Sequence, residues 1–109
     1  MRSTIWYVWS VNDDPVTNQY LVQVVGEQNP EYLHTDKLCA DGKRRNLFRC
    51  PKGYADVLKA ITAIAEYGLK IEVFQENIDG VITRYDLWKS LVRKAARYGR
   101  FTKARTRNV

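Results

Sequence analysis

The chain has 109 residues, of which 45% are hydrophobic and 28% are charged, and its formal net charge at pH 7 is +6. This length suits one domain and leaves no room for a second independent core. Three Trp, seven Tyr and three Phe exclude a disordered chain, which would contain fewer aromatic residues. We therefore expect one folded domain over residues 1–99, followed by a basic, flexible tail over residues 100–109.

The most apolar N-terminal run is short. It covers residues 5–9 and is followed at once by Ser10 and a group of polar residues. A signal peptide needs a longer apolar region, and a membrane span a much longer one. We expect a cytoplasmic protein with no membrane span, in which Cys39 and Cys50 stay reduced.

Two strands are predicted near the N-terminus. Residues 4–11 are dominated by Trp, Tyr, Val and Ile on both faces, as in a strand that is covered on both sides. The polar residues 12–15 predict a turn. Residues 19–25, which are rich in Val, predict a second strand, so we expect the two strands to form an antiparallel hairpin.

The segment 26–51 has two interpretations. Asp41-Gly42 is typical of a type I′ hairpin turn, and it predicts a β-ribbon with the basic run Lys43-Arg44-Arg45 just after the turn. A long surface loop fits the same residues nearly as well.

One helix and a further hairpin are predicted next. Residues 54–67 place apolar side chains over a wide arc of a helix, and Gly68 is predicted as the left-handed residue that ends it. Residues 70–75 alternate between apolar and polar and predict a third strand. Asp79-Gly80 then offers a tight turn before a short return strand at Val81-Ile82.

A second helix is predicted near the C-terminus. Thr83 and Asp86 have the spacing of a capping box, and the helix should run to about Tyr98, with an apolar half and a basic half. The predicted fold is therefore α+β, a small antiparallel sheet covered on one face by two helices, with a basic C-terminal tail.

Positive charge is concentrated at the C-terminus. Residues 84–109 hold nine Lys or Arg and one acid, a net charge of +8, whereas residues 1–83 hold nine bases and eleven acids, a net charge of −2. A smaller cluster over residues 37–52 has six bases against Asp41. Such segregation predicts a polyanionic partner, which can be nucleic acid, an anionic membrane surface or an acidic protein surface.

The C-terminal helix has the strongest functional pattern. Four cations spaced at i, i+4, i+8 and i+11 from residue 89 would form a stripe roughly 16 Å long on one helix face. A stripe of this kind neutralises several phosphates and gives affinity that is independent of sequence. We predict non-catalytic binding to the backbone of DNA or RNA by the helix, the tail and the ribbon, through Lys89, Arg93, Lys94, Arg97, Arg100, Lys103, Arg105, Arg107, Lys43, Arg44, Arg45 and Arg49.

Two other function classes remain open. A protein-interaction module would dock the same basic face on an acidic partner, and a compact, highly charged domain also suits a small regulator or inhibitor of phage or mobile-element origin. A small basic nuclease would need only charge stabilisation and proton transfer. The sequence has no P-loop, dinucleotide fingerprint or zinc-protease motif, so a non-catalytic role without a cofactor is favoured.

Two further patterns are typical of an ordinary folded domain. The aromatic residues Trp6, Tyr7, Trp9 and Tyr20 could stack on single-stranded bases, but large aromatics in a strand that is apolar on both faces are mostly buried, so we expect them in the core. The soft metal ligands are one His and two Cys, which is fewer than a zinc site needs and lacks its spacing. We predict no metal.

Overall fold

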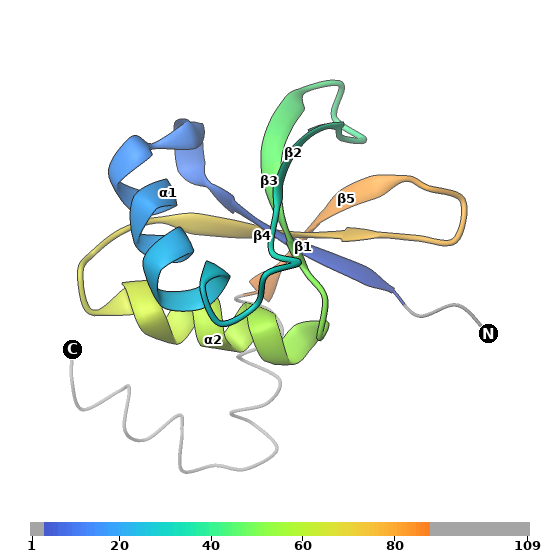
Figure 1. The fold of residues 1–109 in the computed structure, drawn as a ribbon. Coiled ribbons are helices and arrows are strands. Elements are labelled where there is room, and N and C mark those ends of the chain that lie inside the picture. Colours follow the sequence, from blue (N-terminus) through green and yellow to red (C-terminus); the bar gives the residue numbers. More distant parts are fainter. Residues whose placement is uncertain (1–3, 88–109) are drawn as a thin grey trace, which may run out of the picture.

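The structure, a computed structural model, describes residues 4–87 of the chain. The five strands pair antiparallel in the order β2-β3-β1-β4-β5, which confirms the predicted α+β class with an antiparallel sheet (Figure 1). Neither described α-helix is long and apolar enough to cross a membrane. The elements in chain order are β1 (Ile5–Ser10), η1 (Val11–Asp13), α1 (Pro15–Leu21), η2 (Val22–Gly26), β2 (His34–Leu38), β3 (Arg44–Cys50), α2 (Tyr54–Ala65), β4 (Ile71–Glu76) and β5 (Ile82–Tyr85).

The first six main elements follow the order β-α-β-β-α-β. Two split β-α-β units interleave in this order, an arrangement called ferredoxin-like, and β5 extends the sheet as the return strand of β4. Strand β1 is central, because its Val8 lies opposite Phe48 of β3 on one side and opposite Val73 of β4 on the other.

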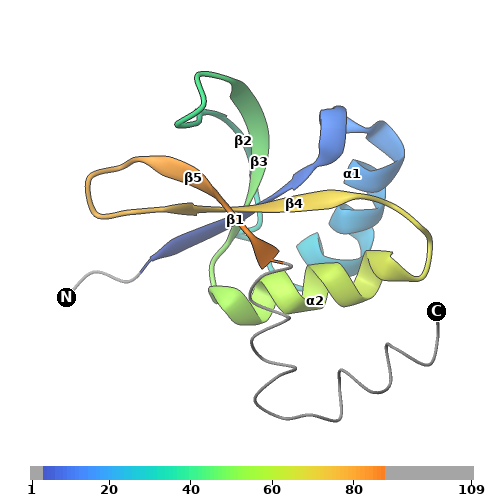
Figure 2. The same cartoon turned by 180° about the vertical axis from the view of Figure 1, so that it is seen from behind.

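Both helices cover the same face of the sheet (Figures 1 and 2). The helix α1 continues into η2, a π-helical turn in which the N–H of Glu27 donates to the carbonyl of Val22. The cluster under the helices is fully buried. It includes Val8, Phe48 and Val73 from the sheet, Leu21 and Val25 from α1 and η2, and Val57, Ala60 and Ile64 from α2.

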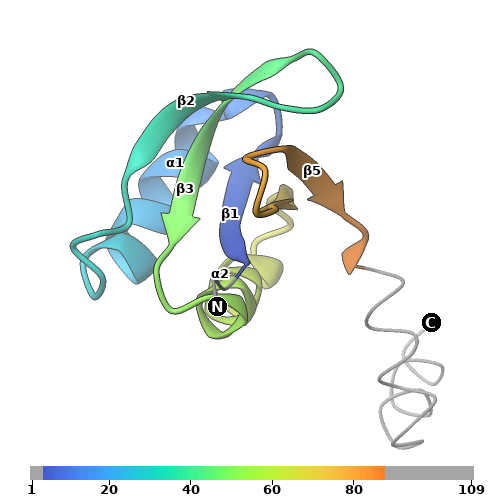
Figure 3. The ribbon, with the colours of Figure 1, turned by 90° about the vertical axis from the view of Figure 1, so that its right-hand side faces the viewer.

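The opposite face of the sheet has a second buried cluster, which we call the second-face cluster. It consists of Tyr7, Cys39, Leu47, Phe74 and Ile82. The curl of the sheet covers it, because the end of the β2–β3 hairpin leans towards β5 (Figure 3). There the N–H of Ala40 donates to the carbonyl oxygen of Ile82 at 2.7 Å.

The segment predicted as the second strand is helical. Residues 19–25 lie in α1 and η2, so the hairpin predicted between them and residues 4–11 is wrong. Asp14 begins the helix by accepting from the N–H and the hydroxyl of Thr17, at 3.0 and 2.6 Å. These hydrogen bonds also lower the pKa of Asp14. Leu21 and Val25, one helical turn apart, are both completely buried.

The other predicted elements are mostly confirmed. The predicted helix at residues 54–67 is α2, and the strand predicted at residues 70–75 is β4. Strand β5 is longer than expected and contains Thr83, so Thr83 cannot cap a helix and the predicted capping box is wrong. The remainder of that predicted helix, Trp88 in its apolar half and the domain boundary at residue 99 lie outside the described residues.

The helical assignment of residues 19–25 predicts unequal effects at neighbouring positions. Leu21→Ala should lower the free energy of unfolding by about 3 kcal/mol, because it empties a fully buried site. Val22→Ala, at a side chain that is 46% exposed, should change it by less than about 0.5 kcal/mol. Urea unfolding of both variants measures the difference, and equal losses would contradict the assignment.

Candidate functional site

The basic segment forms the predicted ribbon. Strands β2 and β3 pair from His34 opposite Phe48 to Leu38 opposite Arg44. The N–H of Cys39 then donates to the carbonyl of Lys43, which leaves a three-residue loop. Only the glycine of this loop, at residue 42, has a positive φ, of 86°. A type I′ turn needs positive φ at both central residues, so the hairpin is confirmed and its predicted turn type is wrong.

Arg45 holds this hairpin on the second-face cluster. Its guanidinium donates twice to the Asp41 carboxylate, at 3.0 and 2.7 Å, and lies 4.8 Å from the ring centres of both Trp9 and Phe74. The hydrogen bonds from Arg45 hold the pKa of Asp41 well below its usual range. With only 8% of its surface exposed, Arg45 stabilises the fold and presents little surface to a phosphate. Its predicted role as a phosphate contact is therefore replaced by a structural one.

The remaining charges of the hairpin are mostly cationic. Arg44 forms an ion pair with Asp36 at 3.0 Å, in which both side chains are more than half exposed. After this pair and the Arg45–Asp41 pair, three charged side chains of the hairpin have no ion-pair partner among the described residues, and all three are positive: Lys37, Lys43 and Arg49.

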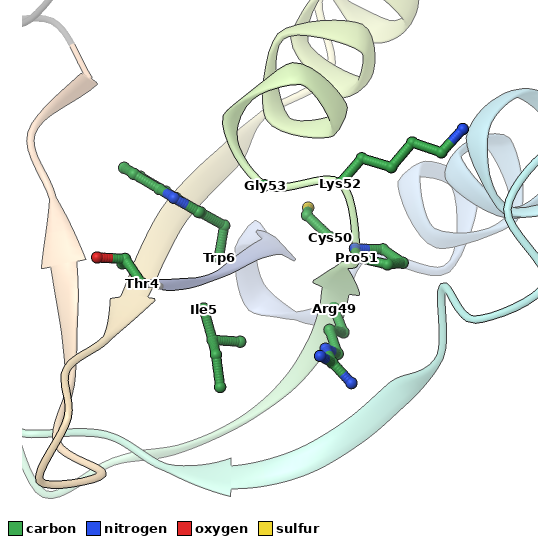
Figure 4. A pocket seen from close by; sticks show the side chains of 8 residues that line it. All are labelled: Thr4, Ile5, Trp6, Arg49, Cys50, Pro51, Lys52 and Gly53. Carbon is green, nitrogen blue, oxygen red and sulfur yellow. The ribbon is translucent and has the colours of Figure 1, made fainter. Parts of the chain in front are cut away.

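Arg49 lies between two hollows of the surface. The first, a depression of about 870 Å³ at the end of the sheet, is also lined by Trp6 and Lys52. Figure 4 shows Arg49 pointing to one side of the strands and Trp6 to the other, while Lys52 points away from Arg49. These side chains do not converge, so the depression lacks the geometry of a catalytic or cofactor site.

The second hollow, which we call the sheet-face groove, has a volume of about 590 Å³. It lies on the same face as the second-face cluster, and Arg49 and Lys37 line it together with Leu33, Thr35 and two acids. One of these acids, Glu76, accepts a hydrogen bond from the Tyr7 hydroxyl at 2.7 Å.

The aromatic residues of β1 pack as expected. Tyr7 is only 3% exposed, and Phe74 beside it on β4 is only 2% exposed. Trp6, Trp9 and Tyr20 are partly buried against the two clusters. The two central aromatics of the second face are therefore closed to nucleic-acid bases, which need an open ring on which to stack.

The histidine and cysteine side chains do not form a metal site or a disulfide. Cys39 and Cys50 are both free, and they lie in different clusters on opposite faces of the sheet. Burial raises the pKa of the Cys50 thiol to about 12 and lowers the pKa of His34, which packs on the Phe48 ring, to about 4. Within residues 4–87 no three His, Cys, Asp or Glu side chains are grouped to hold a metal ion.

The predicted contact residues divide between two parts of the chain. Lys43, Arg44 and Arg49 lie on the β2–β3 hairpin, whereas the predicted contacts from Lys89 to Arg107 lie outside the described residues. Residues 4–87 hold nine bases and twelve acids, a net charge of −3, and the other 25 residues hold nine bases and no acid. The described domain is therefore acidic, and the whole positive excess comes from the rest of the chain.

Comparison with known proteins finds no relative. No protein-family model, no curated protein and no solved structure matches the chain. Function is therefore inferred from the charges, contacts and exposed backbone of this chain.

The structure predicts that Arg45 acts in stability. Arg45→Lys should lower the free energy of unfolding by about 1–2 kcal/mol, because Lys supplies neither the paired hydrogen bonds to Asp41 nor a flat group between two rings. Thermal unfolding measures this loss. Arg44→Lys, at an exposed pair, is the matched control and should cost less than about 0.5 kcal/mol. Equal losses would contradict the assigned role.

The lowered pKa of His34 predicts a dependence of stability on pH. The unfolded chain binds a proton at His34 below about pH 6.5, whereas the folded chain binds it only near pH 4. The stabilisation is thus complete above pH 6.5 and is lost as the pH falls towards 4. We expect a loss of about 1–2 kcal/mol, which allows for the solvent that still reaches the ring. His34→Phe should reduce the pH dependence in this window, and an unchanged profile would contradict the prediction.

Proposed function

We propose that this protein binds nucleic acid through the phosphate backbone, without catalysis and with weak sequence preference. The principal contacts come from the basic residues after residue 87. A secondary contact comes from Lys43 and Arg49 of the β2–β3 hairpin, together with Lys37 beside them.

The distribution of charge supports this proposal. Residues 88–109 contain eight Lys or Arg and no acid, so this segment has no internal carboxylate with which to form ion pairs. A chain that carries free cations at this density neutralises phosphates and releases their counterions, whatever the base sequence.

The described domain supports a limited area of contact. Its net charge of −3 repels a polyanion, so nucleic acid would approach only where cations lack partners. On the hairpin these are Lys37, Lys43 and Arg49. Because Tyr7 and Phe74 are buried, the sheet supplies charge at this place and no stacking, which favours contacts to phosphates over contacts to bases.

A protein-interaction module is the alternative. It would place the same basic residues on an acidic protein surface, and strand β2, which lies at one edge of the sheet, favours a protein partner at one further place. The two functions differ in a direct measurement. A purified nucleic acid of random sequence binds under the first, with an affinity that falls steeply with salt.

The test replaces three cations of the predicted stripe. In the variant Lys89→Gln, Arg93→Gln, Arg97→Gln, the slope of log affinity against log salt for random duplex DNA should fall in magnitude by about 2–3, because about three phosphates lose their contact. Affinity should fall by a similar factor for all sequences. Fluorescence anisotropy over a salt series measures both.

A control variant has the same change in charge elsewhere. Lys59→Gln, Lys70→Gln, Arg84→Gln removes three cations that lie outside the proposed contacts, and it should change the slope by less than about 1. An equal change in both variants would show a response to net charge alone. That result, or no binding of the wild-type protein to DNA or RNA at low salt, would refute the proposal.

A further inference from the structure

The two edges of the sheet expose different backbone groups. In an antiparallel pair, alternate residues bond to the neighbouring strand and those between them point outward. The N–H of Arg49 donates to the carbonyl of Leu33, and the N–H of Cys39 donates to the carbonyl of Lys43. These two bonds fix the alternation in β2, so the odd-numbered residues bond to β3, and the backbone groups of His34, Asp36 and Leu38 point away from the sheet.

The edge at β2 is open, whereas the edge at β5 is partly closed. The same alternation makes the backbone of Ile82 point outward from β5, but its carbonyl accepts the N–H of Ala40. Within residues 4–87 the outward backbone groups of His34, Asp36 and Leu38 have no hydrogen-bond partner. Strand β2 therefore offers a row of free donors and acceptors to another strand.

The side chains around this edge favour an acidic partner. Lys37 lies on β2 and Arg49 on β3, both line the sheet-face groove, and neither has an ion-pair partner among the described residues. Leu33, which is 60% exposed, lines the same groove. The acid of β2 itself, Asp36, is paired with Arg44. The unbalanced charge beside the open edge is thus positive, next to an exposed apolar side chain.

We propose that strand β2 binds an extended peptide with acidic side chains as an added strand of the sheet. Its backbone would pair with His34, Asp36 and Leu38, and alternate side chains of the peptide would lie over the sheet-face groove, where carboxylates meet Lys37 and Arg49. This surface is independent of the nucleic-acid contacts proposed for residues 88–109.

Protection against pairing and self-association account for the edge less well. Charged side chains on an edge strand can serve only to prevent pairing, but Arg44 already balances Asp36 here, and Lys37 alone discourages basic partners more than acidic ones. A second copy of the chain, paired symmetrically about the middle of β2, would place the two Asp36 carboxylates opposite each other, which is unfavourable.

The test uses synthetic peptides as probes. The first is an acetylated and amidated peptide of alternating Glu and Val, and its control has Lys in place of every Glu. Fluorescence anisotropy with the full chain should show the Glu peptide binding at least about tenfold more tightly than the Lys peptide. Lys37→Glu should remove this preference without unfolding the protein, because the side chain is on the surface.

Hydrogen exchange measured by NMR distinguishes strand addition from attraction between charges. In the free protein the amides of Thr35 and Lys37 should be protected, because they bond to β3, and those of His34, Asp36 and Leu38 should exchange rapidly. The Glu peptide should slow exchange of the second group at least about tenfold and leave the first nearly unchanged.

Proline tests the outward N–H directly. Asp36→Pro removes an N–H that points away from the sheet, at an edge position where proline is tolerated, and it should weaken peptide binding about tenfold relative to Asp36→Ala. Both variants lose the ion pair with Arg44, so their difference isolates the backbone. Leu38→Pro against Leu38→Ala repeats the comparison if Asp36→Pro does not fold.

Several results would overturn the proposal. They are no binding of the Glu peptide by the folded wild-type protein at about 1 mM, equal binding of the Lys peptide, or binding that leaves the amides of His34, Asp36 and Leu38 unprotected. Protection of these amides before any peptide is added would assign the edge to a second copy. Their protection by duplex DNA would assign it to nucleic acid. Loss of DNA binding in the Lys89, Arg93, Arg97 variant would leave the peptide result unaffected.

Discussion

The fold depends on strand β1, which is hydrogen-bonded along both edges and covered on both faces. Val8, completely buried, faces the helices, and Tyr7, 3% exposed, faces the second-face cluster. A shift of one residue in the pairing would exchange these two side chains between faces, so the two clusters together fix the register. A strand of this kind needs two covers. The helices α1 and α2 supply one, and the curled β2–β3 hairpin, held by Arg45, contributes to the other.

The second cover decides what the sheet can bind. A β-α-β-β-α-β domain can present the face opposite its helices to single-stranded nucleic acid when aromatic side chains are exposed there. In this protein Arg45 lies over the rings of Trp9 and Phe74, and the hairpin turn reaches β5. The central aromatics thus stabilise a core, and what the described surface offers a partner is charge and one open strand edge. The topology alone would have suggested a different mode of binding, because a fold does not determine a function.

The sequence predicts the elements whose local pattern and long-range packing agree. Residues 54–67 and 70–75 have clear periodicity, and Asp41-Gly42 marks a hairpin. The run of Val in residues 19–25 favours a strand by local propensity, whereas Asp14 followed by proline is also a favourable helix start. Burial of Leu21 and Val25 on one helix face decides between them, and that depends on the tertiary structure. The same limit applies to Arg45, because its burial requires Trp9 and Phe74 from other strands, and to the open edge of β2, which follows from strand order.

The two proposed contacts share part of one surface, and this has a thermodynamic consequence. Lys37 and Arg49 line the groove beside β2 and are also the cations through which the hairpin would touch a phosphate backbone. A peptide on β2 would neutralise them, so it would weaken the secondary nucleic-acid contact and leave the contacts after residue 87 in place. Because linkage between two ligands is reciprocal, nucleic acid would weaken the peptide by the same factor. The factor should be small at high salt, where exposed cations are screened, whereas the backbone pairing to His34, Asp36 and Leu38 is much less sensitive to salt.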